Sequence, residues 1–460
     1  MRSKKAARFL IPLLLAALLL TTPSAHAASE VNRFKVSIIV DASGSMKRTD
    51  PEHLRFTAIR LFMHLLTEEG NVVGGVVFST GIDAQTPLRR IRGQDDKDRI
   101  VSDLEAVPAN GQWTNIGEAL MTSVQSLIAD EGQPKDSVII FLSDGNTDLG
   151  GDREKERLSM EKQAEAIQLA RENDIDIYSI CLNVNGDADT DEMRRISGSE
   201  ELFRNISSAS DLWNVFNDFH SMIYGSSTIN IADEIFPADG EVDKTFYVPG
   251  VGVEEVNIII YGDLKALEIT RPDGTIYPER HLTEDFVTTL KITNPMRGTW
   301  KLHSVGVPKE HIKIDMKNNS DMVVDVGVSP PESESYTAGK TQTITGTLKS
   351  GETPGSAESY QDYTAELLVT DAQGNVISTD PMKVQGASFQ KDVQLPEGTY
   401  NFTILITDKA YGGVTSEDYG PITVGPKENH PPIPTQETVS DSITVWPVRN
   451  QPYTDRKSVV

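Results

Sequence analysis

Hydrophobic and polar positions follow different periodicities in the two parts of this chain. Between residues 34 and 224, short apolar runs such as 34–40, 71–79 and 136–144 alternate with segments whose apolar residues recur every three to four positions. After about residue 226 the helical periodicity ends, and short strand-like runs are separated by Gly, Pro and Asp-Gly turns. The chain therefore changes from an α/β pattern to an all-β pattern.

The α/β part is expected to form one doubly wound domain over residues 34–224. Strands that alternate with helices favour a mainly parallel sheet with helices on both faces. One long charged helix is expected from about Arg153 to Glu172, with Met160, Ala164 and Ile167 on one face. In such sheets ligands bind beyond the carboxyl ends of the strands, so residues that directly follow a strand are the candidates for a site.

The remainder is expected to form two β-sandwiches and a tail. Residues 226–320 contain short strands over a length that suits one sandwich, with Trp300 in its core. Residues 321–425 again contain short strand-like runs separated by turns, with the size and strand spacing of an immunoglobulin-like sandwich. Residues 426–460 start in a Pro-rich run, which predicts an extended linker followed by a tail.

Residues 1–27 have the pattern of a secretory signal peptide. Four basic residues and no acidic one precede the apolar run LIPLLLAALLL, and AHA at 25–27 suits signal peptidase. An uncleaved N-terminal anchor is the alternative. No later apolar run is long enough to predict a membrane-spanning helix. We therefore expect an exported bacterial protein that is secreted or associated with the cell surface or envelope.

Charge and cysteine content narrow the function classes. The formal net charge is −25, which argues against a basic surface for nucleic-acid phosphates. Cys181 is the single cysteine, so an internal disulfide is excluded. It lies in an apolar strand-like run and is expected to be a buried core residue.

Oxygen-bearing side chains follow two of the predicted strands. Asp41 ends the first strand, and Ser43 and Ser45 come at the next alternate positions. Hydroxyls at alternate positions of an extended segment can point the same way, and neutral oxygens with a carboxylate suit a hard cation such as Mg²⁺. Thr114, in a loop before a helix, and Asp144, after the most apolar strand, offer two further oxygen ligands. The sequence thus predicts a divalent-cation site.

Three segments carry a family resemblance. DASGS at 41–45, TNIGEAL at 114–120 and SDG at 143–145 match the family pattern in order and spacing. The chain from about 34 to 224 therefore resembles a von Willebrand factor A domain with a metal-ion-dependent adhesion site, of the exported bacterial type with C-terminal β-sandwich modules. The motif-bearing part is less than half of the chain.

The resemblance implies a role for each matching residue. Ser43 and Ser45 would bind the metal directly through their hydroxyls, and Thr114 directly or through water. Asp41 and Asp144 would bind directly or through water and hold the serines in place. A cation held largely by neutral oxygens remains a Lewis acid at its open position, which a partner's Asp or Glu can fill. The expected cofactor is Mg²⁺, or else Mn²⁺ or another divalent cation.

Trp113 departs from the family pattern, in which a small residue is frequent before the threonine. It could cover the metal and select among ligands, which makes it a candidate for ligand contact. It could equally pack against the neighbouring loop.

A second acidic cluster invites a calcium interpretation. Asp187, Asp189 and Asp191 have EF-hand spacing, but the loop glycine and the final glutamate of that motif are missing. A solvated loop with Asp189 or Thr190 as the N-cap of the next helix is the better interpretation.

The expected function is capture of a protein ligand that presents Asp or Glu. The alternative is an assembly or regulatory subunit of a cell-envelope complex, which would use the same site for one dedicated partner. An enzyme is not expected, because the sequence supplies no general base beside the metal and has neither an H-E-x-x-H motif nor a nucleophile elbow.

Overall fold

The computed structural model describes residues 33–224, 228–278, 281–284, 286–331, 336–351, 353–412 and 414–426. The predicted signal peptide (1–27) and nearly all of the predicted linker and tail (426–460) lie outside the described residues. Within the described ranges, no helix has the length and apolar character needed to cross a membrane.

The N-terminal part is a doubly wound α/β domain, as the sequence predicts. Its sheet has the order β3-β2-β1-β4-β5-β6, and all neighbours are parallel except the β2–β3 hairpin. The strands are β1 (Lys35–Asp41), β2 (Glu69–Phe78), β3 (Ile82–Arg92), β4 (Ser137–Ser143), β5 (Ile175–Leu182) and β6 (Phe203–Ile206). The helices are α1 (Met46–Thr49), α2 (Leu54–Leu65), α3 (Gln94–Glu105), α4 (Ile116–Ala129), α5 (Arg153–Glu172), α6 (Thr190–Ser197), the 3-10 turn η1 (Glu200–Leu202) and α7 (Ala209–Tyr224).

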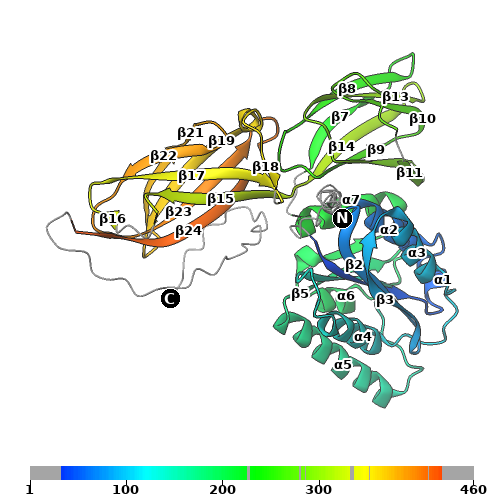
Figure 1. Ribbon diagram of the computed structural model, residues 1–460. Coiled ribbons are helices and arrows are strands. Elements are labelled where there is room, and N and C mark those ends of the chain that lie inside the picture. The colour runs from blue at the N-terminus through cyan, green and yellow to red at the C-terminus, as the bar shows by residue number, and fades with distance from the viewer. Residues whose placement is uncertain are drawn as a thin grey trace, which may run out of the picture.

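Helices cover both faces of this sheet (Figure 1). Helices α2, α3 and α7 pack on the face that carries Val36 and Ile38, and α4, α5 and α6 pack on the face that carries Ile39. Burial on both faces explains why the strands read as continuous apolar runs. Cys181 is fully buried in β5, as expected, and this burial raises the pKa of its thiol to about 12.

The buried face of α5 differs from the prediction. Ala164 is exposed, and the buried stripe instead includes Ser159, Gln163 and Ile167. Polar residues occupy this stripe because they have buried partners. The Gln163 side chain donates to Glu192 at 2.8 Å, and the Ser159 hydroxyl donates to a side-chain oxygen in the loop before α4. Apolar periodicity alone therefore does not identify the buried face of α5 correctly.

Two β-sandwiches follow the α/β domain, which confirms the predicted fold class. In the described residues, the first pairs the sheet β10-β13-β8 with the sheet β11-β12-β9-β14-β7. Its strands are β7 (Ile229–Ile235), β8 (Glu241–Val248), β9 (Glu255–Tyr261), β10 (Leu264–Thr270), β11 (His281–Glu284), β12 (Val287–Thr293), β13 (Gly298–Gly306) and β14 (His311–Asn319). Trp300 is 1% exposed in the core between them, as predicted.

The second sandwich pairs the sheet β15-β17-β22-β21, to which β18 adds at β17, with the sheet β16-β24-β23-β19-β20. Its strand neighbours are antiparallel except β16 and β24. The elements are β15 (Met322–Ser329), β16 (Tyr336–Thr337), β17 (Thr341–Ser350), β18 (Thr353–Pro354), η2 (Ser359–Asp362), β19 (Tyr363–Asp371), β20 (Val376–Pro381), β21 (Lys383–Val384), β22 (Phe389–Gln394), β23 (Gly398–Asp408) and β24 (Val414–Gly425).

The first sandwich packs against the amino ends of the parallel strands. Arg33, just before β1, pairs with Glu254, and the main-chain N–H of Glu68, just before β2, donates to Glu255. Helix α7 lies at the same junction (Figure 1). Asp41 ends the seven-residue strand β1, about 20 Å from the start of the strand at the usual rise per residue. The carboxyl edge of the sheet is therefore at the end of the domain remote from the sandwiches.

Asp362 joins the two sandwiches. Its carboxylate accepts the hydroxyl of Tyr247 at 2.7 Å, the main-chain N–H of Gly250 at 2.9 Å, and Nε and Nη2 of Arg297 at 2.8 Å each. Burial acts to raise the pKa of this carboxyl, but the hydrogen bonds from Arg297 and Tyr247 outweigh it and hold the pKa below its usual value. Four donors of the first sandwich thus converge on one carboxylate of the second and help to hold the angle between them.

Replacing Asp362 by alanine is expected to loosen this angle, because Arg297 and Tyr247 lose their common acceptor. Small-angle X-ray scattering should then show a broader distance distribution than for the unchanged chain. Asp392→Ala, which removes an exposed carboxylate of the same sandwich, is the matched control. Identical scattering from the two variants would show that Asp362 does not hold the sandwiches.

Candidate metal site

The predicted site residues gather at the carboxyl edge of the α/β sheet. Asp41 ends β1 and Asp144 directly follows β4, and these strands are parallel neighbours. Both carboxylates are buried, with exposures of 0% and 3%. Ser43 and Ser45 lie in the turn between β1 and α1. Because β1 and β4 are adjacent and parallel, four of the five predicted metal ligands lie at the same edge of the sheet.

The loop that carries Thr114 is brought to the same edge by main-chain contacts. The N–H of Gly44 donates to the carbonyl of Gly111 at 2.8 Å. Glycine is required at 111, because a Cβ there would lie 2.1 Å from the Cβ of Ser79. Thr114 exchanges two main-chain hydrogen bonds with Asp148, at 2.8 and 3.1 Å. The Thr114 loop therefore lies between the turn after β1 and the loop after β4.

Asp41 and the two serines are held by one another. Asp41 Oδ1 accepts the main-chain N–H of Ser43 at 2.7 Å, which turns the chain immediately after the strand. The hydroxyl oxygens of Ser43 and Ser45 are 2.9 Å apart. Neighbouring ligands of an octahedral Mg²⁺ at 2.0–2.1 Å are separated by about 2.9 Å, so this pair already has the spacing of two adjacent ligands.

Asp144 carries a buried oxygen without a protein partner. Its Oδ2 accepts the hydroxyl of Thr49 at 2.9 Å, whereas its Oδ1 is buried and has no hydrogen-bond partner in the described part of the chain. Burial, and then the negative charge of Asp144, raise the pKa of Asp41 above its usual value. Two buried carboxylates that repel each other are stabilised by a cation between them. The residues present therefore fit a divalent metal with oxygen ligands.

Two residues of the site were missed by the sequence analysis. Ser143 Oγ donates to Asp41 Oδ2 at 2.6 Å and accepts the N–H of Gly145 at 3.0 Å. The SDG segment contains Ser143, so its place at the end of a strand could have indicated this role. Thr49, which donates to Asp144, lies in a one-turn helix and has no signal in the sequence.

The loop after β4 is anchored by α6. The main-chain N–H and the hydroxyl of Thr147 donate to the carboxylate of Glu192, at 3.1 and 2.5 Å. The N–H of Asp189 donates to the carbonyl of Asp144 at 2.9 Å. The side chain of Asp189 caps α6 through two main-chain N–H groups, which confirms the N-cap interpretation of this acidic cluster. Asp144 is thus held through its main chain by Asp189 and through its side chain by Thr49.

The ring of Trp113 lies against the loop after β4. A Cβ placed on Gly150 would be 2.7 Å from Cζ2 of the ring, so only glycine allows this approach. The main-chain N–H of Trp113 donates to the hydroxyl of Thr80 at 3.2 Å. The side chain is partly buried, which agrees with packing against a neighbouring loop, and its contact with a ligand stays a prediction.

Comparison with known proteins agrees with this architecture. Residues 36–218 match the family model of the von Willebrand factor type A domain. A curated relative, calcium-activated chloride channel regulator 1 of Equus caballus, is 27% identical over 168 residues, which are 36% of this chain and 17% of the relative. The chain thus spans less than a fifth of the length of this relative.

The solved structures that resemble this chain are more distant in sequence. A von Willebrand factor type A protein from Catenulispora acidiphila is 13% identical, with a TM-score of 0.32, and the match covers 76% of this chain and 65% of that one. A pilus adhesin from Lactobacillus rhamnosus GG is 10% identical, with a TM-score of 0.34, over 85% of this chain and 66% of the adhesin.

Proposed function

We propose that the von Willebrand factor type A domain at residues 36–218 is an extracytoplasmic protein-binding module that depends on a divalent metal. It captures an Asp or Glu side chain of a protein ligand. The observation that supports this best is the buried Oδ1 of Asp144, which has no hydrogen-bond partner among the described residues and lies at the same sheet edge as the Ser43–Ser45 hydroxyl pair. Mg²⁺ is the proposed metal, with Mn²⁺ as the substitute.

Each residue of the site has a distinct task in this proposal. Ser43 and Ser45 contribute neutral oxygens at the spacing of adjacent ligands, and Thr114 contributes a third hydroxyl from the neighbouring loop. Asp41 holds the turn through the N–H of Ser43, while Asp144 offers an open carboxylate oxygen. When bound, the cation supplies Lewis acidity toward an incoming carboxylate.

The position of the site suits capture of a large partner. The site lies at the end of the domain remote from the sandwiches, so neither sandwich obstructs a protein that approaches it. Figure 1 shows the first sandwich on the α/β domain and the second extending to one side from the junction between them. In the proposal they act as spacers, and export through the predicted leader places the module outside the cytoplasm.

Metal-dependent capture by the immobilised chain tests this function. Envelope proteins of the source cell should be retained in Mg²⁺ and released by EDTA, and Asp144→Ala should retain none of them. Substitution of single acidic residues in the captured protein should then abolish its binding. Retention that survives EDTA, or that does not depend on any acidic residue of the partner, would contradict the proposal.

A further inference from the structure

Basic side chains are concentrated at the junction between the α/β domain and the first sandwich. Four of them are at most 9% exposed, namely Lys97, His220, Lys291 and Lys317. On the sandwich side, the buried carboxylate of Glu255 accepts a hydrogen bond from Lys291 at 2.8 Å, and that of Asp315 pairs with Lys313 at 2.8 Å. These two carboxylates are therefore already matched by lysines, and a further buried positive charge at the junction would be poorly compensated.

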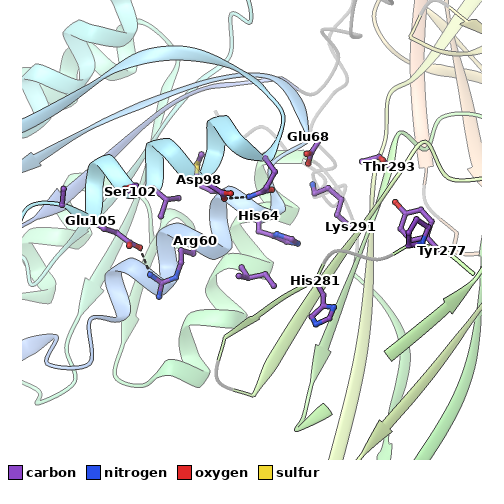
Figure 2. Close-up of a pocket in the computed structure, with 16 residues that line it drawn as sticks. Arg60, His64, Glu68, Asp98, Ser102, Glu105, Tyr277, His281, Lys291 and Thr293 are labelled. Atoms are coloured by element: carbon purple, nitrogen blue, oxygen red, sulfur yellow. Dashed lines mark hydrogen bonds and ion pairs between the residues drawn. The ribbon is translucent and has the colours of Figure 1, made fainter. Parts of the chain in front are cut away.

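Two ammonium groups meet at the carboxyl end of α2. Nζ of Lys97, from α3, and Nζ of Lys291, from β12, each donate to the carbonyl of Leu66 at 2.7 Å. His64 lies in the last turn of α2, and Figure 2 shows it with Lys291 in the space between this helix and the strands of the sandwich. Its Nε2 is buried and has no hydrogen-bond partner among the described residues. Burial, followed by the charges of Lys291 and Lys97, lowers the pKa of His64 to about 3, so the ring is neutral.

His220 is buried between α7 and the sandwich. It is 2% exposed, and its ring stacks on Tyr224 with the ring centroids 4.5 Å apart. Nζ of Lys317, from β14, donates to a main-chain carbonyl of α7 at 2.6 Å. Burial, followed by the charges of Lys317 and Lys291, holds the pKa of His220 well below its usual value, although hydrogen bonds to the ring act in the opposite direction. This imidazole is therefore neutral as well.

Other charged and titratable groups surround the two rings on the elements packed against them. They are Arg60 on α2, Glu68 after α2, Asp98 and Glu105 on α3, Asp218 and Tyr224 on α7, Glu255 on β9, Tyr277 after β10, His281 on β11 and Asp315 on β14. Carboxyl and phenol groups ordinarily titrate near pH 4 and pH 10, and His281 is exposed. Between pH 7 and pH 5, separation of the two domains would therefore change chiefly the protonation of the two buried imidazoles.

The contact between the two domains is not closely packed throughout. A cavity of about 1080 Å³ lies between α2 and α3 on one side and β11 and β12 on the other (Figure 2). Protein interiors are normally close-packed, so this part of the junction lacks the apolar contact that would hold the domains together irrespective of charge. Apolar residues such as Ile259 and Val287 do pack against the core of the α/β domain. The closed junction thus combines some apolar contact with an excess of buried basic groups.

We propose that this junction opens in mild acid and is closed at neutral pH. Opening exposes His64 and His220 to water, where an imidazolium is hydrated, whereas in the closed junction it would be buried beside ammonium groups. The domains can part without unfolding, because the α/β domain and the sandwich each have a hydrophobic core of their own. The proposal does not rest on the function of the metal site, which lies at the other end of the α/β domain.

The direction of the pH dependence follows from proton uptake on opening. A base whose pKa is lowered in the closed state stabilises that state at pH values above its ordinary pKa, and this contribution is lost as the pH falls. With an ordinary imidazole pKa of about 6.5, a fall from pH 7 to pH 5 should raise the ratio of open to closed molecules about 25-fold per histidine. Burial lowers the pKa values of Lys97 and Lys317 to about 7, so these groups act in the same direction in the neutral range.

Distances between two spin labels test the proposal in the full chain. Arg99→Cys on α3 and Glu268→Cys on β10 place the labels at exposed positions of the two domains, and the buried Cys181 stays unlabelled. All samples contain EDTA, so that loss of metal in acid plays no part. We expect one distance distribution at pH 7.5, a second and longer one at pH 5, and return to the first when the pH is restored.

His64→Gln combined with His220→Gln removes both titrating rings and keeps neutral side chains that form hydrogen bonds. This variant should stay closed at pH 5. The matched control is His303→Gln combined with His311→Gln, which removes two histidines of the same sandwich whose side chains are 37% and 59% exposed. The control should open as the unchanged chain does.

The unchanged chain decides the matter if the glutamine variant is open at both pH values. A single titrating group changes the ratio of open to closed molecules at most tenfold per pH unit, so two should exceed tenfold between pH 6 and pH 5. A smaller rise in the unchanged chain would overturn the proposal. So would equal opening of the glutamine variant and its control in acid, or loss of secondary structure, seen by circular dichroism, over the same pH range.

Discussion

Replacement of Asp144 by alanine is expected to abolish saturable binding of Mg²⁺ and Mn²⁺ to this chain. Removal of groups that merely support a metal ligand already weakens affinity 10- to 100-fold, so loss of this carboxylate should exceed about 100-fold. The reason is electrostatic, since Asp41 alone would then balance the divalent charge. Calorimetric titration of the unchanged chain and the variant, side by side, measures the difference.

The stability of the same variant in EDTA separates a metal role from a structural one. Without metal, Asp144 adds negative charge beside the buried Asp41, and one of its oxygens has no partner in the part of the chain that the structure describes. The variant should therefore unfold in EDTA at a temperature no lower than the unchanged chain does. Asp191→Ala, at an exposed position on α6, should retain metal binding. Equal metal affinity in the unchanged chain and Asp144→Ala would remove Asp144 from the site.

Replacement of Glu255 by alanine is expected to destabilise the chain by roughly 3–5 kcal/mol, the usual cost of breaking a buried ion pair. Glu255 and Lys291 are both buried, and the ammonium of Lys291 also donates to the carbonyl of Leu66 at 2.7 Å. Lys97 donates to the same carbonyl at 2.7 Å. Removing Glu255 therefore leaves two neighbouring buried ammonium groups with much less compensation. Urea unfolding followed by tryptophan fluorescence gives the free energy.

Burial acts to raise the pKa of Glu255, but the charges of Lys291 and Lys97 outweigh it and lower the pKa below its usual value. A carboxyl whose pKa is lowered by folding stabilises the protein at pH values above its unfolded pKa. This contribution is lost as the pH falls through the folded pKa. The difference between the unchanged chain and Glu255→Ala should therefore be full at neutral pH and shrink in acid.

The double variant Glu255→Leu with Lys291→Met tests whether the charge or the shape of this junction matters. Replacing both members of a buried pair with apolar groups is often neutral or stabilising, so the double variant should recover most of the loss. Glu268→Ala, at an exposed position of the same sandwich, should change the free energy of unfolding little. A Glu255→Ala variant as stable as Glu268→Ala would show that the pair does not hold the junction.

Much of the candidate site could be predicted because its key residues lie at the ends of recognisable strands. Asp41 and Asp144 terminate apolar runs, and parallel neighbours necessarily bring such ends to one edge. The role of Thr49 could not be predicted from strand ends. Its hydrogen bond to Asp144 joins residues 95 positions apart and depends on where the short helix α1 lies in the folded domain. Ser143 was visible as a residue but not as a partner of Asp41.

Polar residues on buried faces account for the errors in the fold. The stripe of α5 was misplaced because Gln163 is buried by virtue of its hydrogen bond to Glu192, which a hydrophobic pattern does not register. Polar residues are also buried on the face of the first sandwich that contacts the α/β domain, where β9 and β12 lie. Glu255 and Lys291 alternate with apolar core residues and look like solvent-facing positions in the sequence, yet both are buried.

The sequence by itself determined the order of the elements, the change from α/β to all-β and the edge of the sheet at which Asp41, Ser43, Ser45 and Asp144 meet. These follow from local periodicity, strand ends and short motifs. Only the tertiary structure decided which polar groups are buried, how α6 holds the loop of Asp144, and that a cavity opens between the first two domains. Those features depend on contacts between segments far apart in the chain, where charge compensation and hydrogen bonding outweigh the hydrophobic pattern of each segment.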